Sequence, residues 1–329
     1  MARTRPLVIG HRGAPGYRPE HTRTSYELAI SMGVDAVEPD VVVSRDGVLV
    51  VRHENEIGST TDVAEHPEFA DRRTTRSIDG EALTGWFTED FTWDELVTLR
   101  CRERLPLLRP GSASHDDAEP MLRLRDLLDL VREASFSRGR EIGIVLEIKH
   151  ATHFGAQGWD VAGLVDAELR AAGWGSGAHP LVIESFEQTV LERVRDRGIR
   201  ASYVYLLAGE GRPFDLVVRD GDAAPTYVQT ASPAGLDLLA GRFDGISVDK
   251  ALIVDHPASR VVDDAHARGL QIYTWTCRPE NAFLSPRFRR PGADAAFGDY
   301  EGEWTAIRDA GIDGVFVDHA DLGVAFFGG

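Results

Sequence analysis

The chain has 329 residues, 43% of them hydrophobic, and its formal net charge is −17. The length and apolar content predict a globular protein built as one large α/β barrel or as two ordinary domains. The acidic balance and the absence of any basic run argue against binding to nucleic acid or to anionic membranes, and an anionic small substrate would need local cations or a metal ion.

The chain begins with MARTRPLVIGHRG and has no apolar leader, and no later apolar run reaches the length of a membrane span. We therefore expect a cytoplasmic protein without stable membrane insertion, unless a secretory leader has been removed. The two cysteines, Cys101 and Cys277, are far apart and lack metal-site spacing, so we expect ordinary thiols. The sequence does not indicate an oligomeric state.

Apolar, β-branched runs alternate along the chain with helix-like segments, several of which end in glycine. The expected strands are residues 7–11, 36–43, 143–149, 180–186, 201–207, 245–249, 271–276 and 313–318. The expected helices include residues 22–33, 122–134, 160–173, 189–198 and 259–269. Eight β–α units predict a (β/α)₈ TIM barrel. A doubly wound sheet is the alternative, but no GxGxxG motif follows the first strand.

A further apolar run, VLVVRH at residues 48–53, follows the second strand after only SRDG. Four residues are too few for a parallel crossover, and Asp46-Gly47 is a hairpin signal, so we expect an antiparallel return arm. If Val43 pairs with Val48, His53 lies opposite Glu38, and Asp40 shares their face.

Two irregular stretches interrupt the barrel pattern. Residues 54–120 are polar, with a helical signal at TWDELVTLR, and are expected to form a small insertion domain over the barrel mouth. The barrel domain then comprises residues 1–53 and 121–329. Residues 278–303, which follow the seventh strand, are expected to form a second lid-like loop.

Charged residues stand at the carboxyl ends of several expected strands, where a barrel places its active site. Gly10-His11-Arg12-Gly13 ends the first strand and joins an imidazole to a fixed cation between glycines. An ordinary solvated turn would also fit these four residues. The pairs Glu38/Asp40 and Glu147/Lys149 have the i, i+2 spacing that puts each pair on one face of a strand.

Glu38, Asp40 and Glu147 form an all-oxygen set, which suits Ca²⁺ or Mg²⁺ rather than zinc. An ion pair of Glu147 with Lys149 or Arg12 is the structural alternative, and a core imidazole is the alternative for His53.

With a divalent ion in place, Arg12 and Lys149 would complete a pocket for a phosphate oxyanion. His11 and His53 can act as general base and general acid near neutral pH. This combination suits cleavage of a phosphodiester, whose alkoxide leaving group needs a proton.

A series of motifs in this order resembles the glycerophosphodiester phosphodiesterase family. They are HRG at residues 11–13, PEHT at 19–22, EPDV at 38–41, RHEN at 52–55, EIK at 147–149, ESFE at 184–187, YTWT at 273–276 and DGVFVD at 313–318. The resemblance covers nearly the whole chain. TTDVAEHPEF at residues 60–69 and TCRPENAFL at 276–284 are closer to the longer, calcium-using bacterial type.

The resemblance implies a barrel with a small insertion and hydrolysis of glycerophosphodiesters to sn-glycerol 3-phosphate and an alcohol. It implies that His11 and His53 are the acid–base pair, and that Glu38, Asp40 and Glu147 hold Ca²⁺, with Mg²⁺ as the alternative ion. The resemblance assigns substrate binding to Arg12, Lys149, Trp275 and Glu20. Trp275 would line the glycerol or alcohol side, and Glu20 would orient the His11 loop or a neighbouring ligand.

Two residues depart from the family pattern: His21 replaces the usual Asn, and Glu54 replaces the usual Asp after the second histidine. Neither is an expected direct contact, so we expect altered rates rather than lost activity. Two alternative functions remain at this stage. One is a phospholipase-type phosphodiesterase that acts on lipid, and the other is a non-catalytic barrel that binds phosphoesters.

Overall fold

The computed structural model describes residues 5–255 and 259–329. Residues 1–4 and 256–258, which belong to the predicted barrel domain, lie outside the described residues. Within the described ranges, no helix combines the length and hydropathy needed to cross a membrane. Cys101 and Cys277 are both buried and free.

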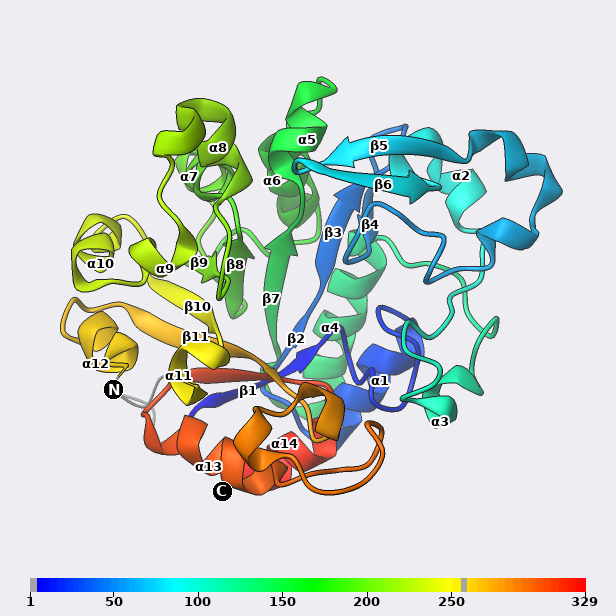
Figure 1. The fold of residues 1–329 in the computed structure, drawn as a ribbon. Helices are drawn as coiled ribbons and strands as arrows, with labels where there is room; N and C mark the ends of the chain where they lie inside the picture. Colours follow the sequence, from blue (N-terminus) through cyan, green and yellow to red (C-terminus); the bar gives the residue numbers. More distant parts are fainter. Residues whose placement is uncertain (1–4, 256–258) are drawn as a thin grey trace.

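Ten strands form one sheet, and a pairing between β2 and β7 closes it into a barrel (Figure 1). β2 and β3 occupy one position because the strand breaks at Pro39, and β4 lies outside the ring, so eight parallel positions remain. This confirms the predicted TIM barrel. The strands of this sheet are β1 (Leu7–His11), β2 (Ala36–Glu38), β3 (Asp40–Val43), β4 (Leu49–Val51), β7 (Gly143–Ile148), β8 (Leu181–Ser185), β9 (Ser202–Leu207), β10 (Gly245–Asp249), β11 (Gln271–Cys277) and β12 (Gly314–Val317).

Helices surround this sheet, and the five helical segments predicted from the sequence are all present. They correspond to α1 (Arg23–Met32), α4 (Leu124–Arg138), α6 (Val161–Ala171), α7 (Gln188–Asp196) and α12 (Val261–His266). Thr22 caps α1 by accepting a hydrogen bond from the Ser25 N–H, and Gly33 ends it in the left-handed conformation. The remaining barrel helices are α5 (Ala151–Ala156), α8 (Phe214–Asp220), α9 (Tyr227–Thr230), α10 (Pro233–Leu239), α11 (Ala251–Val254), α13 (Tyr300–Asp309) and α14 (Ala320–Phe327).

The barrel core has two parts. Inside the barrel, Ile9, Val145, Val204, Tyr273 and Phe316 pack into one cluster. A larger cluster fills the space between the sheet and the helices, and it continues into residues 57–101 of the segment that follows β4. This inner cluster fills the barrel interior below the carboxyl ends of its strands.

The β3–β4 hairpin exists as predicted, but its predicted register is wrong by one residue. Val43 pairs with Leu49, not with Val48, and Val41 pairs with Val51. The difference arises in the turn, where the Ser44 N–H donates to the Val48 carbonyl and Gly47 adopts φ +81°. Five residues rather than four separate the paired Val43 and Leu49, and the Arg52 N–H donates to the Asp40 carbonyl. His53 therefore does not lie directly opposite Glu38 as predicted.

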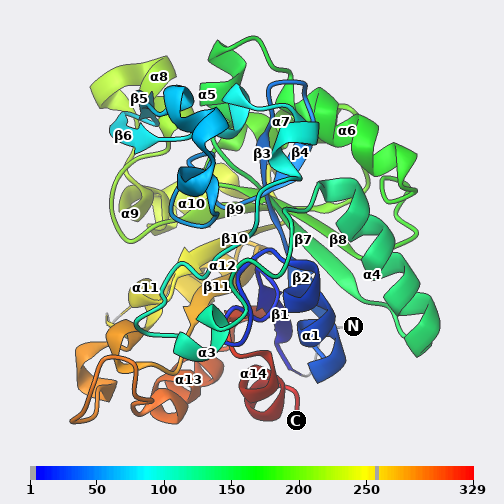
Figure 2. The same ribbon diagram turned by 90° about the vertical axis from the view of Figure 1, so that its right-hand side faces the viewer.

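Residues 54–120 run along one side of the barrel, from β5 and β6 to α3 (Figure 2). Their elements are β5 (Thr74–Ile78), β6 (Glu81–Gly85), α2 (Trp93–Leu96), α3 (Pro110–Ala113) and the 3₁₀ turns Val63–Glu65, Pro67–Arg72 and Thr88–Asp90. At one end, Asp79 in the β5–β6 turn contacts His150 after β7, with 2.6 Å between Oδ2 and Nδ1. That this segment is a separate domain stays a prediction, because its apolar side chains share the barrel's outer cluster.

The tip of β1 turns back on itself within a few residues. Arg12 has φ +53° and Gly13 has φ +95°. The Gly13 N–H donates to the Gly10 carbonyl, and the Ala14 N–H donates to Ser25 Oγ on α1. This tight turn places His11 and Arg12 side by side at the barrel mouth.

We expect Gly13→Ala to lower the free energy of unfolding by roughly 3 kcal/mol. Alanine disfavours the positive φ of this position, and its Cβ would be too close to neighbouring atoms. An added Cβ would lie 2.4 Å from Ser25 Oγ. Gly139→Ala is a matched control: its φ is +61°, but no atom lies within 4 Å, so the loss should be about 1 kcal/mol. Urea unfolding of both variants measures the difference, and equal losses would contradict the account of this turn.

Candidate active site

A cavity of about 560 Å³ opens at the carboxyl ends of the barrel strands. Its lining comes from the ends of β1, β2, β7 and β8, and from the loops after β10 and β11. Barrel enzymes carry their active sites at this end. The lining includes His11, Arg12, Glu38, His53, Glu147, Lys149, Glu184, Phe186 and Trp275.

Three glutamates meet in this cavity: Glu38 at the end of β2, Glu147 in β7 and Glu184 in β8. One carboxylate oxygen from each lies within 4.8 Å of the other two, and all three side chains are buried. Among the described residues, Glu38 Oε1 and Glu184 Oε2 have no hydrogen-bond partner. Glu147 and Glu184 are register partners on neighbouring strands, so the sheet itself holds these carboxylates together.

The crowding of the glutamates makes their ionisation unfavourable. Burial and the nearby Asp40 and Glu147 raise the pKa of Glu38 well above its ordinary value. Burial and Glu147 do the same to the pKa of Glu184. Burial also raises the pKa of Glu147 to about 8, even though its carboxylate lies 2.5 Å from Lys149 Nζ. Buried carboxylates without enough partner charge are the groups that a hard cation would stabilise.

Asp40, the third expected metal ligand, has a different environment from the three glutamates. It lies 2.9 Å from His21 Nε2, 3.2 Å from Lys149 Nζ and 3.4 Å from Arg12 Nε. Although burial opposes ionisation, Lys149 and the other nearby basic groups hold the pKa of Asp40 well below its usual range. The break at Pro39 separates Asp40 from Glu38, and the role of Asp40 as a ligand stays a prediction.

Arg12 and Lys149 bring positive charge to the cavity and are fixed by carboxylates. Arg12 Nη1 donates to Glu20 Oε2 at 3.1 Å, and its backbone N–H donates to Glu38 Oε2 at 2.8 Å. Lys149 is paired with both Asp40 and Glu147. Glu20 is buried behind Arg12 and does not line the cavity.

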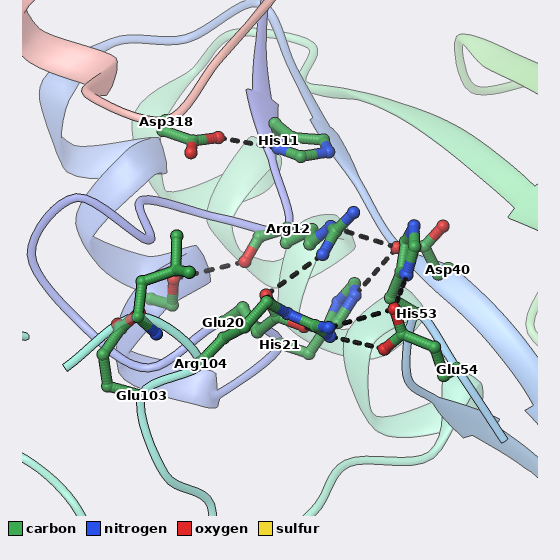
Figure 3. A network of polar contacts seen from close by, with 12 residues as sticks. His11, Arg12, Glu20, His21, Asp40, His53, Glu54, Glu103, Arg104 and Asp318 are labelled. Carbon is green, nitrogen blue, oxygen red and sulfur yellow. Dashed lines mark hydrogen bonds and ion pairs between the residues drawn. The ribbon is translucent and has the colours of Figure 1, made fainter. Parts of the chain in front are cut away.

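His11 lies at the tip of β1 and is almost fully buried. Its Nδ1 is 2.7 Å from Asp318 Oδ1, at the end of β12 (Figure 3). An ionised carboxylate can only accept, so we assign the ring proton to Nδ1, which leaves Nε2 as the basic nitrogen. Burial, followed by the charge of Arg12, lowers the pKa of His11 to about 4.

His53 follows β4 and is arranged in the same way. Its Nδ1 contacts Glu54 Oε1, and among the described residues its Nε2 has no hydrogen-bond partner. Burial, followed by the charges of Arg12 and Lys149, lowers the pKa of His53 to about 3. Both rings are therefore uncharged at neutral pH when the cavity holds no anion.

Aromatic side chains form another wall of the cavity. Trp275 in β11 and Phe186 after β8 meet edge to face, with ring centroids 5.7 Å apart. The loop of residues 278–303, predicted to be lid-like, contributes further lining residues between Arg278 and Arg289. This loop contains 3₁₀ turns at Asn281–Phe283 and Pro286–Phe288.

Several residues of the site were not identified from the sequence. Glu184 and Asp318 lie in the ESFE and DGVFVD motifs, at the ends of β8 and β12. Their position at strand ends could have identified them as site residues. His21 was expected to have no direct role, yet it is fully buried between Asp40 and Tyr26, whose hydroxyl is 2.7 Å from Nδ1. Glu54 forms an ion pair with Arg104, and nothing in the sequence pattern indicated this pair.

Comparison with known proteins identifies a family that matches this arrangement. The sequence model of the Glycerophosphoryl diester phosphodiesterase family matches residues 11–322. The chain is 30% identical to glycerophosphodiester phosphodiesterase GDPD6 of Arabidopsis thaliana, over 96% of this chain and 84% of the relative. It is 27% identical to the glycerophosphodiester phosphodiesterase of Treponema pallidum, over 98% and 92% of the two chains.

Solved structures share the fold. A phosphodiesterase from Oleispira antarctica, in complex with the product sn-glycerol-3-phosphate, superposes with a TM-score of 0.64 at 18% identity, covering 99% of this chain and 98% of the other. A glycerophosphodiester phosphodiesterase from Agrobacterium tumefaciens gives a TM-score of 0.58 at 17% identity, covering 97% and 99%.

Proposed function

The chain belongs to the glycerophosphoryl diester phosphodiesterase family, and from this we propose that it hydrolyses glycerophosphodiesters to sn-glycerol 3-phosphate and an alcohol. We further propose that it does so with one divalent cation and with His11 and His53 as the acid–base pair. The observation that carries the proposal is the cavity itself. Three crowded carboxylates, two imidazoles and the basic side chains of Arg12 and Lys149 line one space at the carboxyl ends of the barrel strands.

The side chains present fit a hard cation. Within the part of the chain that the structure describes, Glu38 and Glu184 each have a buried oxygen without a hydrogen-bond partner, and Glu147 lies between them in the sheet. These three glutamates would hold the ion, with Asp40 beside Glu147 as the fourth candidate. Oxygen ligands favour Ca²⁺ or Mg²⁺, and we propose Ca²⁺ first. When bound, the ion would polarise a phosphoryl oxygen and offset negative charge.

Arg12 and Lys149 would orient the phosphodiester. Lys149 Nζ is ion-paired with Asp40 and Glu147. Its ammonium group has three N–H donors, so it would still offer a donor to a phosphate oxygen. Arg12 is held by Glu20 and Asp40 on one side while it lines the cavity on the other. Two fixed cations would position the phosphorus without large side-chain movements.

The two histidines would move the protons. One ring, through its basic Nε2, would take the proton of the glycerol 2-hydroxyl as it attacks phosphorus, and the other would protonate the departing alcohol oxygen. Water would then open the resulting cyclic phosphate and give sn-glycerol 3-phosphate. The anionic substrate opposes the charges of Arg12 and Lys149, which lower the pKa of His53. Substrate binding would therefore favour protonation of the ring that acts as the acid. Asp318 and Glu54 would keep each ring in the required tautomer.

We expect His11→Ala and His53→Ala each to lower kcat on glycerophosphocholine by roughly 10³-fold, because each removes one proton-transfer group. The assay measures sn-glycerol 3-phosphate and choline. His266→Ala is the control, because His266 is on α12 and pairs with Asp313 at the opposite end of the barrel.

Three outcomes of this assay would contradict the proposal. Turnover of phosphatidylcholine vesicles without turnover of glycerophosphocholine would favour a lipid phosphodiesterase. Binding of glycerophosphocholine without product would favour a non-catalytic protein. Unchanged kcat in both histidine variants would remove the proposed acid–base pair.

We also expect Ca²⁺ to stabilise the protein against thermal unfolding, by about 2.7 kcal/mol at a concentration 100 times its Kd. Glu38→Gln and Glu184→Gln should abolish this gain, yet each should be more stable than the parent chain in EDTA because one crowded carboxylate is gone. Glu187→Gln is the control, since Glu187 is also buried but does not line the cavity. Stabilisation by Ca²⁺ that persists in Glu38→Gln and Glu184→Gln would contradict the assigned ligands.

A further inference from the structure

The carboxylates that hold the two histidines are themselves held by arginines from one short loop. This loop, residues 103–109, joins α2 to α3 and belongs to the segment between β4 and α4; we call it the clamp loop. It contributes Arg104 and Arg109, neither of which is among the residues that line the substrate cavity. Figure 3 shows Arg104 between Glu20 and Glu54.

Arg104 joins two carboxylates. Its Nη1 donates to Glu54 Oε1 at 3.0 Å and its Nη2 contacts Glu54 Oε2. On the other side, Nε and Nη2 donate to both oxygens of Glu20, at 2.9 and 2.6 Å. Glu54 contacts His53 Nδ1, and Glu20 accepts from Arg12. One guanidinium therefore fixes the partner of a histidine and the partner of a phosphate-facing arginine.

Arg109 acts on the other histidine. It is buried, and its Nη2 donates to Asp318 Oδ2 at 2.7 Å while Nε donates to Glu280 Oε1 at 2.8 Å. The second oxygen of Asp318 accepts from His11 Nδ1. Arg278 also donates to Asp318 Oδ2, at 2.6 Å. Asp318 is thus held by arginines from two different loops.

We propose that Arg104 and Arg109 are positioning residues, which fix the orientation of His53 through Glu54 and of His11 through Asp318. The inference rests on the proposed function, because it assigns the clamp loop to the same two histidines. Arg104 binds Glu54 through two nitrogens, whereas Asp318 Oδ2 is shared by Arg109 and Arg278. A carboxylate held in this way has little rotational freedom, so the imidazole that it contacts has one orientation and one tautomer. The segment between β4 and α4 would then be part of the catalytic apparatus rather than only a cover.

The clamp loop has supports that do not depend on these two arginines. Glu103 Oε1 accepts from the Leu105 N–H at 2.8 Å, and the Glu103 N–H donates to Asp116 at 2.7 Å. Just before the loop, Arg102 pairs with Asp117 and Glu65, at 2.6 and 2.7 Å. Arg102 is a matched control for Arg104, since their side chains are 27% and 25% exposed and both bind two carboxylates.

The test compares Arg104→Met, Arg109→Met and Arg102→Met with the parent chain, using glycerophosphocholine and saturating Ca²⁺. We expect Arg109→Met to lower kcat by roughly 30-fold with KM nearly unchanged, because Arg109 reaches His11 through Asp318 and does not line the cavity. Arg104→Met should lower kcat to a similar extent and also raise KM, since Glu20 and Arg12 lose their anchor. Arg102→Met should change neither constant by more than about twofold.

A double variant separates positioning from general destabilisation. If Arg109 acts through Asp318, Arg109→Met should have almost no further effect on kcat when Asp318 is already Asn. An equal reduction of kcat by Arg109→Met in the parent chain and in Asp318→Asn would overturn the proposal. A kcat for Arg109→Met equal to that of Arg102→Met would do the same.

Arg109→Met removes the arginine partner of the buried Glu280, and this variant could fail to fold for that reason alone. A second variant therefore tests the same inference. Arg109→Lys keeps the charge but cannot bind two carboxylates in the same geometry. We expect it to lower kcat by roughly tenfold without changing the thermal unfolding midpoint by more than a few degrees. An unchanged kcat in Arg109→Lys would overturn the inference. Absence of any hydrolysis by the parent chain would instead overturn the proposed function.

Discussion

Repulsion among buried carboxylates is the constraint that organises this barrel mouth. Glu38, Glu147 and Glu184 come from neighbouring strands, so the closed sheet fixes their separation and they cannot move apart. Such a cluster is costly in a low-dielectric site unless positive charge is supplied. Lys149 and Arg12 supply part of it. Among the described residues, one oxygen each of Glu38 and Glu184 has no partner, and we propose that a bound cation supplies the remaining positive charge.

Pairing of buried carboxylates with positive charge also occurs behind the two histidines. Each imidazole contacts a carboxylate, and each carboxylate is paired with arginine from the clamp loop. Each carboxylate behind a histidine therefore faces an arginine of opposite charge, which allows these ionised groups to be buried together. The arrangement also makes the orientation of the histidines depend on residues 103–109, far from them in sequence.

The sequence was sufficient for the barrel, because strand and helix periodicities are local and repeat eight times. The β3–β4 hairpin was also predicted, but its register depended on the turn at Ser44–Gly47, whose hydrogen bonds cannot be read from a DG signal alone. The convergence of Glu38 with Glu147 followed from their positions at strand ends. The participation of Glu184, and the separation of Asp40 by the break at Pro39, depended on three-dimensional packing. The pairing of Arg104 with Glu54 joins residues 50 positions apart and had no local signal.

Anomalous diffraction from crystals of the protein soaked in Mn²⁺, a hard ion that replaces Ca²⁺ or Mg²⁺ in oxygen sites, tests the central claim most directly. The account predicts one strong anomalous peak per chain, within bonding distance of oxygens from Glu38, Glu147 and Glu184. A map without a peak among these carboxylates, or with its main peak elsewhere on the chain, would contradict it.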